Sequence, residues 1–195
     1  RVYVKREASG CLGLQQILLS AFKAAVWATE KGRLWRVALA HLDQCRVKDV
    51  DGGDVKVVEL RRFCAFLERI DVFGKDQDGK EDSSLLLTDR TAKYYNTFFN
   101  DATRSTSSNN QQELPKLIHE KLQWEFAFQK AAFPESMEVV LSTTVKKCLI
   151  GDRLGVLCGS LLAGGIDNHD TAVCEQVYEL CAVNENIPQL ASAVM

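Results

Sequence analysis

The 195-residue chain lacks the short motifs by which common enzyme classes are recognised. It contains no GxSxG, P-loop or kinase signature. Its three histidines, His41, His119 and His169, form no HxxxH or HExxH pair, so a zinc hydrolase has no local support. A Cys-His nucleophile pair would have to assemble from residues distant in sequence. We therefore expect no catalytic residue, metal or cofactor, and we keep enzyme activity as the third function class.

The chain also lacks a disulfide pattern. Its seven cysteines are an odd number, and no two of them form a CxxC motif. Cys174 and Cys181 lie two helical turns apart, a spacing typical of buried thiols. No Asn-x-Ser/Thr acceptor for glycosylation occurs either. Unpaired cysteines of this kind indicate an intracellular protein, cytoplasmic or nuclear.

A long hydrophobic run is missing as well. The most apolar stretch, residues 154–166, is too short and too rich in glycine to cross a bilayer core of about 30 Å, so we expect no membrane span. The chain begins with Arg1 rather than Met, and this expectation therefore does not extend to a targeting peptide.

The net charge is only −2, but the two parts of the chain differ in sign. Residues 1–75 carry fourteen Lys and Arg against nine acids, and residues 76–195 carry ten against seventeen, so the parts are about +5 and −7. This asymmetry favours complementary halves or a basic partner-binding face. The simpler interpretation is that the charges solvate the exteriors of helices.

Helical periodicity is what the sequence does contain. Residues 11–45 form the longest helix-favouring stretch and hold no proline. Gly32 costs about 1 kcal/mol within a helix and suits a C-terminal cap, so we predict that two helices meet there. Lys23, Trp27, Lys31 and Trp35 recur every four residues, which would place alternating cations and indoles on one helical stripe.

Further apolar periodicities follow along the whole chain. They predict an all-α fold of about seven to eight helices, arranged as a bundle or as short stacked hairpins like those of an α-solenoid, with one short extended segment at residues 1–7. No fixed repeat period accompanies the stacked-hairpin alternative. After residue 45, stretches of helical spacing cover residues 55–73, 85–101, 115–132, 134–150, 152–163, 170–181 and 187–194, the last of them short.

Residues 1–195 are predicted to form a single helical domain. The alternative is a division within residues 74–112, between a basic half, 1–73, and an acidic half, 113–195. Within this interval, residues 74–84 resemble the start of a calcium-binding loop but lack two of its main ligands, and residues 102–112 are of low complexity.

A wide apolar arc between residues 114 and 128 is the main candidate for a partner site. It contains Lys121, Trp124, Glu125 and Phe128, and it is wider than one neighbouring helix needs. If the arc is buried, Lys121 and Glu125 form an i,i+4 ion pair; if it is exposed, these four residues await another protein. A stripe of small residues four positions apart, Gly155, Gly159 and Ala163, is expected to let another helix approach closely.

These features favour a helical protein–protein interaction or assembly module, cellular or viral, that binds another protein or a second copy of itself. The alternative is a nucleic-acid-binding protein, because cations contact phosphates and aromatic rings stack on unpaired bases. The residues suited to nucleic acid are Lys23, Lys31, Arg33, Trp35 and Arg36.

Overall fold

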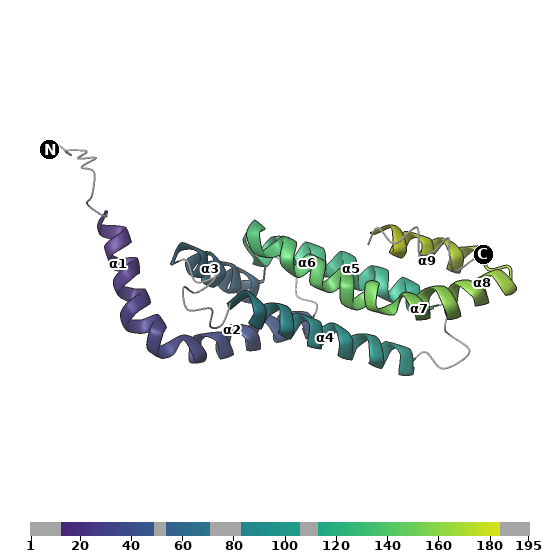
Figure 1. Ribbon diagram of the computed structural model, residues 1–195, viewed down its shortest axis with the longest axis horizontal. Coiled ribbons are helices and arrows are strands. Elements are labelled where there is room, and N and C mark those ends of the chain that lie inside the picture. Colours follow the sequence, from purple (N-terminus) through teal and green to yellow (C-terminus); the bar gives the residue numbers. More distant parts are fainter. Residues whose placement is uncertain (1–12, 49–53, 71–82, 106–112, 184–195) are drawn as a thin grey trace.

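The computed structural model describes residues 13–48, 54–70, 83–105 and 113–183. Every regular element in these ranges is helical, which confirms the all-α prediction (Figure 1). The elements join end to end into six continuous helical segments, fewer than the seven to eight predicted. In chain order they are α1 Leu14–Phe22, the π-helical turn η1 Lys23–Trp27, α2 Ala28–Lys48, α3 Val55–Arg69, α4 Ser83–Ser105, α5 Glu113–Ala132, α6 Glu135–Leu149, the 3-10 turn η2 Gly151–Arg153, α7 Leu154–Val156, the π-helical turn η3 Leu157–Leu162, α8 Ala163–Asp167 and α9 Thr171–Val183.

The first segment does not divide at Gly32, so that expectation was wrong. Helix α2 runs through Gly32 without a break, and nothing lies within 4 Å of the place where a side chain would begin. The change of direction falls earlier, where η1 joins α1 to α2, and Figure 1 shows α1 turning away from the rest of the molecule there. A π-helical turn is a recognised cause of a sharp helix kink.

A second difference lies after α6. The sequence predicted that Gly151 ends this helix, but η2 continues it into α7, η3 and α8. The resulting 33-residue helical segment, Glu135–Asp167, is long and apolar enough to span a membrane by length and composition, with a mean hydropathy of 1.4 in its most apolar window. A core helix passes the same test, and 44% of that window is buried inside the protein. The expectation of no membrane span stays a prediction.

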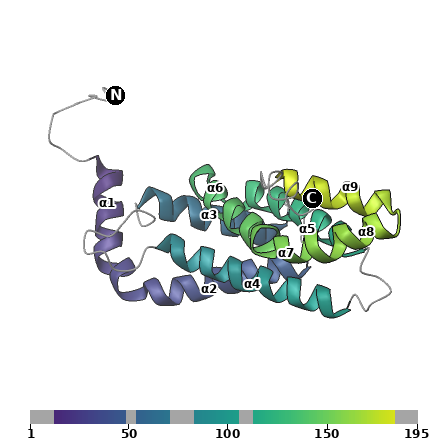
Figure 2. The same ribbon diagram turned by 45° about the vertical axis from the view of Figure 1, so that its right-hand side comes forward.

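Two hydrophobic clusters lie along the elongated molecule. The N-terminal cluster combines η1, α2 and α3 with the first turns of α4 and α6 and the last turns of α5. The C-terminal cluster combines the remainder of α4, α5 and α6 with η3 and α9. Figures 1 and 2 both place α2 and α3 towards one end and α8 and α9 at the other. Helices α4, α5 and α6 therefore contribute to both clusters.

Several expectations concern residues outside the described ranges. The extended segment at 1–7, the calcium-like loop and the helix at 187–194 lie wholly or almost wholly there. The interval 74–112 is described only for α4, which contributes to both clusters. Whether the chain divides into basic and acidic halves stays a prediction.

The turn between α8 and α9 is tightly built. His169 has a φ of 56°, the left-handed conformation that often follows a helix. Its N–H donates to Ile166 O at 3.1 Å, and Asp170 N–H donates to Gly165 O at 2.7 Å. A side chain added at Gly165 would begin 3.0 Å from Cys174 Sγ, whereas Gly155 and Gly159 have nothing within 4 Å. The close helix approach is therefore at Gly165 rather than at the two glycines of the predicted stripe.

Candidate functional site

A buried ion pair joins α2 to α5 between the two hydrophobic clusters. The Arg46 guanidinium donates from Nη2 to Glu125 Oε1 at 2.7 Å and from Nε to Glu125 Oε2 at 3.2 Å. Both side chains are completely buried. A two-point pairing of this kind fixes the planes of both groups as well as their separation. The position of α2 along α5 is therefore set by charge rather than by apolar packing alone.

Other polar side chains extend this pair to four helices. Thr91 of α4 accepts from Arg46 Nη2 at 2.9 Å, and the Tyr95 hydroxyl donates to Glu125 Oε2. Gln129 donates from Nε2 to Glu125 Oε1 at 2.8 Å, and its own Oε1 accepts from the Ser142 hydroxyl of α6 at 2.7 Å. These residues, together with Arg46 and Glu125, are called the polar layer below. On α4, α5 and α6 it lies where one hydrophobic cluster gives way to the other.

The end of α2 is anchored to the same region. The backbone carbonyl of Arg46 is one of the last four carbonyls of α2, and these accept no hydrogen bond from within an ideal helix. It accepts from the Tyr94 hydroxyl at 3.0 Å and from Lys121 Nζ at 3.3 Å. Lys121 Nζ also lies 4.2 Å from the centre of the Trp124 ring. The Lys121 ammonium and the Tyr94 hydroxyl thus donate hydrogen bonds to the C-terminal end of α2, where positive charge is favourable.

Charge and aromatic rings hold the Arg46 guanidinium in its charged form. Burial alone lowers the pKa of Arg46, but the negative charge and hydrogen bonds of Glu125 more than offset it, so the pKa is raised. The rings of Tyr94 and Tyr95 lie 5.5 and 5.6 Å from the guanidinium carbon, a favourable cation–π distance. Burial, and next the charge of Glu125, raise the pKa of Tyr95. The Tyr95 hydroxyl therefore keeps its proton and donates a hydrogen bond to Glu125 at neutral pH.

The polar layer is suited to a structural role rather than to catalysis. Arg46, Thr91, Glu125 and Gln129 are buried, so no substrate atom reaches the carboxylate from solvent. Burying two charges is costly, and a buried pair contributes specificity of packing more readily than net stability. Among the described residues, Arg46 Nη1 has no hydrogen-bond partner. One donor of the pair is thus left unsatisfied, which adds to the cost of the layer.

The residues predicted for partner binding lie largely inward. Glu125 and Phe128 are buried, and Lys121 and Trp124 are partly buried, with the Trp124 and Phe128 rings stacked 5.1 Å apart. The buried alternative for the arc paired Lys121 with Glu125, whereas the carboxylate of Glu125 pairs with Arg46. Arg46 was missed because the predicted helical stretch ended at residue 45. The available signal was its spacing, since Arg46 follows the buried Leu42 by one helical turn.

The residues predicted for nucleic-acid binding separate into two groups. Trp35 is buried against Trp27 and Phe63, with ring centres 6.3 and 6.1 Å away, so it presents no face to a base. The cations are all exposed on η1 and α2, and their positions are Lys23, Lys31, Arg33 and Arg36. The phosphate-binding residue types are therefore accessible while the stacking residue is not.

An apolar groove of about 540 Å³ lies between α2 and α3. Its apolar lining includes Val26, Leu34, Val37, Leu60 and Phe63. Charged and titratable side chains of both signs lie around it, and they are Glu30, Arg33, His41 and Glu59. We call this feature the α2–α3 groove. An apolar floor with a polar rim is the form of a site that receives the apolar face of a helix.

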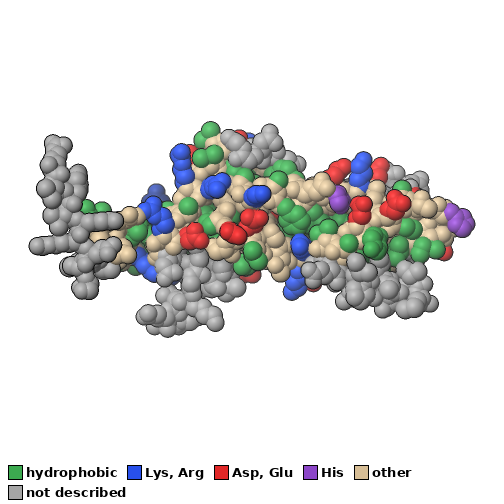
Figure 3. Space-filling view, turned by 90° about the horizontal axis from the view of Figure 1, so that it is seen from above, with side chains coloured by type: hydrophobic (Ala, Val, Ile, Leu, Met, Phe, Trp, Pro, Cys, Tyr) green, Lys and Arg blue, Asp and Glu red, His purple; other side chains and the backbone are tan. Residues whose placement is uncertain are grey.

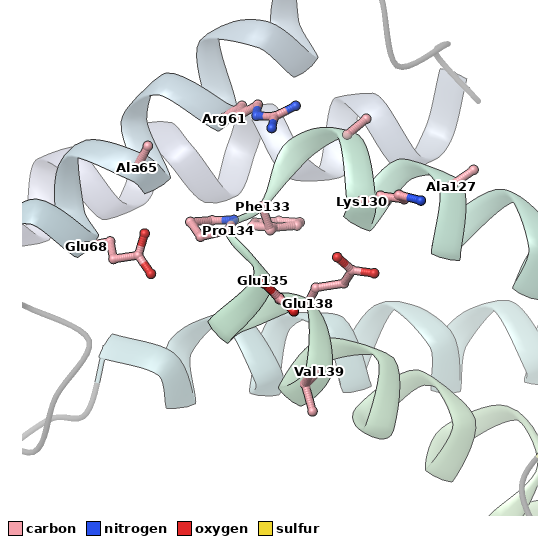
Figure 4. Close-up of a pocket in the computed structure, with 11 residues that line it drawn as sticks. Arg61, Ala65, Glu68, Ala127, Lys130, Phe133, Pro134, Glu135, Glu138 and Val139 are labelled. Carbon is pink, nitrogen blue, oxygen red and sulfur yellow. The ribbon is translucent and has the colours of Figure 1, made fainter.

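A second, more polar groove of about 1010 Å³ lies where α5 meets α6 and faces α3 (Figure 4). Phe133 and Pro134 form its apolar part, and the charged residues around it are Arg61, Glu68, Lys130, Glu135 and Glu138. Charges of both signs also alternate with apolar side chains over the face seen in Figure 3. Mixed charge of this kind selects no particular ionic ligand.

The three histidines lie on separate elements, with His41 at the α2–α3 groove, His119 on α5 and His169 after α8. Within the described ranges, no three His, Cys, Asp or Glu residues are placed to hold a metal ion. Among the described residues, the buried charged side chains are Arg46 and Glu125.

Comparison of the chain with protein-family models, curated proteins and solved structures gives no match. Its function is therefore inferred from its own residues.

Proposed function

We propose that this chain is a helical protein–protein interaction or assembly module. The observation that carries the proposal is the exposed apolar surface at its N-terminal end. Helix α1 has no buried residue, and Leu14, Ile17 and Leu18 present one exposed apolar face. The α2–α3 groove lies on the adjoining elements. Contiguous apolar surface with a polar rim marks protein interaction sites.

The partner surface proposed here differs from the arc at 114–128. That arc supplies Glu125 to the polar layer and Phe128 to the N-terminal cluster, so its inward side is already occupied. Exposed apolar side chains on η1 and α2, Val26 and Val37, instead line the α2–α3 groove. The proposal therefore moves the interface from α5 to the N-terminal elements.

The arrangement of the helices supports a rigid scaffold for this surface. We propose a bundle rather than stacked hairpins, because α4 packs along α6 and α5 packs against both α3 and α6. The intracellular location inferred from the cysteines is kept as part of the proposal.

The proposal is tested with a display library of random helical peptides selected on the immobilised chain. We expect enrichment of peptides with apolar residues at i, i+3, i+4 and i+7, the pattern that docks into grooves. Val37→Glu should abolish their binding, and Val140→Glu, at another exposed valine on α6, should leave it unchanged. Peptides that bind both variants equally, or no enrichment, would argue against a helix-binding groove.

Nucleic-acid binding is the second candidate, and the exposed Lys23, Lys31, Arg33 and Arg36 favour it. Binding through phosphates weakens steeply with salt because counterions are released. Retention on a nucleic-acid column should therefore fall between low and moderate salt, and Arg33→Ala with Arg36→Ala should reduce it. Retention that is absent at low salt excludes this candidate.

A further inference from the structure

In the part of the chain that the structure describes, helix α1 presents a largely exposed apolar face. The exposed fractions of Leu14, Ile17 and Leu18 are 74%, 51% and 61%, and these residues lie at i, i+3 and i+4. Helix α1 is the nine-residue exposed end of a helical segment that continues through η1 into α2. An exposed apolar face of this kind favours a partner surface that covers it.

The charge pattern of α1 restricts what that surface is. The sequence LQQILLSAF contains no charged side chain. Helices that bind membrane surfaces carry Lys or Arg along their polar face, which α1 does not. A neutral helix also brings no like charge to Glu30, Glu59 or Arg33 at the rim of the α2–α3 groove. The α2–α3 groove is therefore a chemically suitable receiver for α1.

The α1 of the same molecule is badly placed to enter this groove. Val26, which lines the groove, belongs to η1, the turn that connects α1 to α2. Helix α1 would have to reverse its direction within η1 to lie against its own groove. Figures 1 and 2 instead show α1 directed away from the other helices. At the end of α1, the Phe22 ring packs edge-on against the Phe66 ring of α3, with the ring centroids 5.0 Å apart. The α1 of a second copy has no such constraint.

We propose that two copies of this chain associate by placing α1 of each in the α2–α3 groove of the other. This inference rests on the proposed function and names the partner. Such an exchange is symmetric and closes after two copies.

The estimated buried area reaches that of a stable dimer only if both α1 helices dock. One face of a nine-residue helix, about 14 Å long, offers on the order of 300 Å² of accessible surface, so one docking buries roughly 600 Å² in total. Two reciprocal dockings bury roughly 1,200 Å², the lower end of stable interfaces, whereas one docking falls below it. A closed dimer is therefore favoured over an open chain of copies.

The test is sedimentation equilibrium of the full chain with three matched variants. We expect the wild type to be dimeric. Leu18→Glu on the α1 face and Val37→Glu in the groove should each weaken the dimer by at least about tenfold, because each buries a carboxylate in the interface. Gln16→Glu adds the same charge to the opposite face of α1 and should leave the dimer unchanged. The wild type and the three variants can all be checked for folding by circular dichroism, and none is expected to unfold because the three substituted residues, Leu18, Val37 and Gln16, are exposed.

Three results would overturn the proposal. A wild type that is monomeric up to about 100 μM excludes a dimer of standard strength. Loss of the dimer in Leu18→Glu but not in Val37→Glu indicates that two α1 helices pair directly. A dimer insensitive to both variants uses another surface. In each case, peptide selection that still depends on Val37 would preserve the proposed function while rejecting the dimer in which α1 occupies the α2–α3 groove.

Discussion

Arg46 and Glu125 lie seventy-nine positions apart in the chain and form its one ion pair with both side chains fully buried among the described residues. Glu125→Gln keeps the shape of the side chain but leaves the Arg46 guanidinium buried without a counter-charge. We expect this change to lower the free energy of unfolding by about 3–5 kcal/mol in urea titrations. Asp43→Asn, which breaks the exposed pair with Arg90, should cost less than about 1 kcal/mol.

The double variant Arg46→Met with Glu125→Gln separates pairing from packing. Removing the cation as well should recover part of the stability lost in Glu125→Gln, because no unpaired charge then remains buried. Equal costs for the single and double variants would mean that the charge of Arg46 is not the source of the loss.

Burial also leaves a signature in the pH dependence of stability. Burial in the N-terminal cluster raises the pKa of Cys64 from 9.0 to about 12. Above pH 9 the unfolded thiol loses its proton while the folded thiol keeps it, so this contribution is complete below pH 9 and is lost as the pH rises towards 12. We expect the free energy of unfolding to fall more steeply with pH in the wild type than in Cys64→Ala, as measured by urea titrations between pH 9 and 12. Equal slopes would contradict this.

At the scale of single residues, the sequence reveals charged side chains within an apolar helix face but not the residues with which they pair. Lys121 and Glu125 were recognised as charges within an apolar arc, and local spacing suggested that they pair with each other. The pairing with Arg46 depends on how α2 crosses α4 and α5, and helical periodicity carries no information about that crossing.

Among the elements, the continuity of α2 through Gly32 shows the limit of local propensity. A glycine costs about 1 kcal/mol, and the buried Trp35, Ala38 and Leu42 that follow it contribute more than this by packing on α3 and its neighbours. The kink at η1 was not predictable, because a π-helical turn has no characteristic residue pattern and KAAVW also suits an α-helix.

Two glycine substitutions should have opposite effects. Gly32→Ala adds a side chain in open space and should stabilise the protein by about 1 kcal/mol. Gly165→Ala gains the same helix propensity but crowds Cys174 Sγ and Val173, so a net loss of about 1 kcal/mol is expected. Thermal unfolding of both variants measures the difference, and stabilisation by Gly165→Ala would show that α9 moves away without cost.

For the molecule as a whole, continuity of α4, α5 and α6 through both clusters predicts one cooperative unfolding transition. All three tryptophans, Trp27, Trp35 and Trp124, belong to the N-terminal cluster or pack against it, whereas Cys158 and Cys181 are buried in the C-terminal cluster. Tryptophan fluorescence and the labelling of Cys158 and Cys181, followed at these two thiols specifically, should therefore report the same urea midpoint. Two separate midpoints would instead support independent basic and acidic halves.

The all-α class was predictable because apolar periodicity, caps and the scarcity of strand patterns all agreed. The order of the helices in space was not, because it follows from contacts between distant residues such as Ser142 with Gln129 and Arg46 with Thr91. The helix count differed for a related reason. Helix α2 runs through Gly32, and η2 continues the helical segment across Gly151, so two glycines that predicted helix ends lie within continuous segments. A short 3-10 turn looks the same as a helix end in a sequence.

The π-helical turn η1 also sets the rotational orientation of α1 relative to α2. Each residue along a helix rotates the side-chain direction by about 100° around the axis. The number of residues in η1 therefore decides the direction in which the apolar face of α1 points. Deleting one alanine from this turn would retain Leu14, Ile17 and Leu18 in their mutual spacing and yet rotate them together to another side of the molecule. The sequence of α1 would be unchanged, and only the direction of its apolar face would differ.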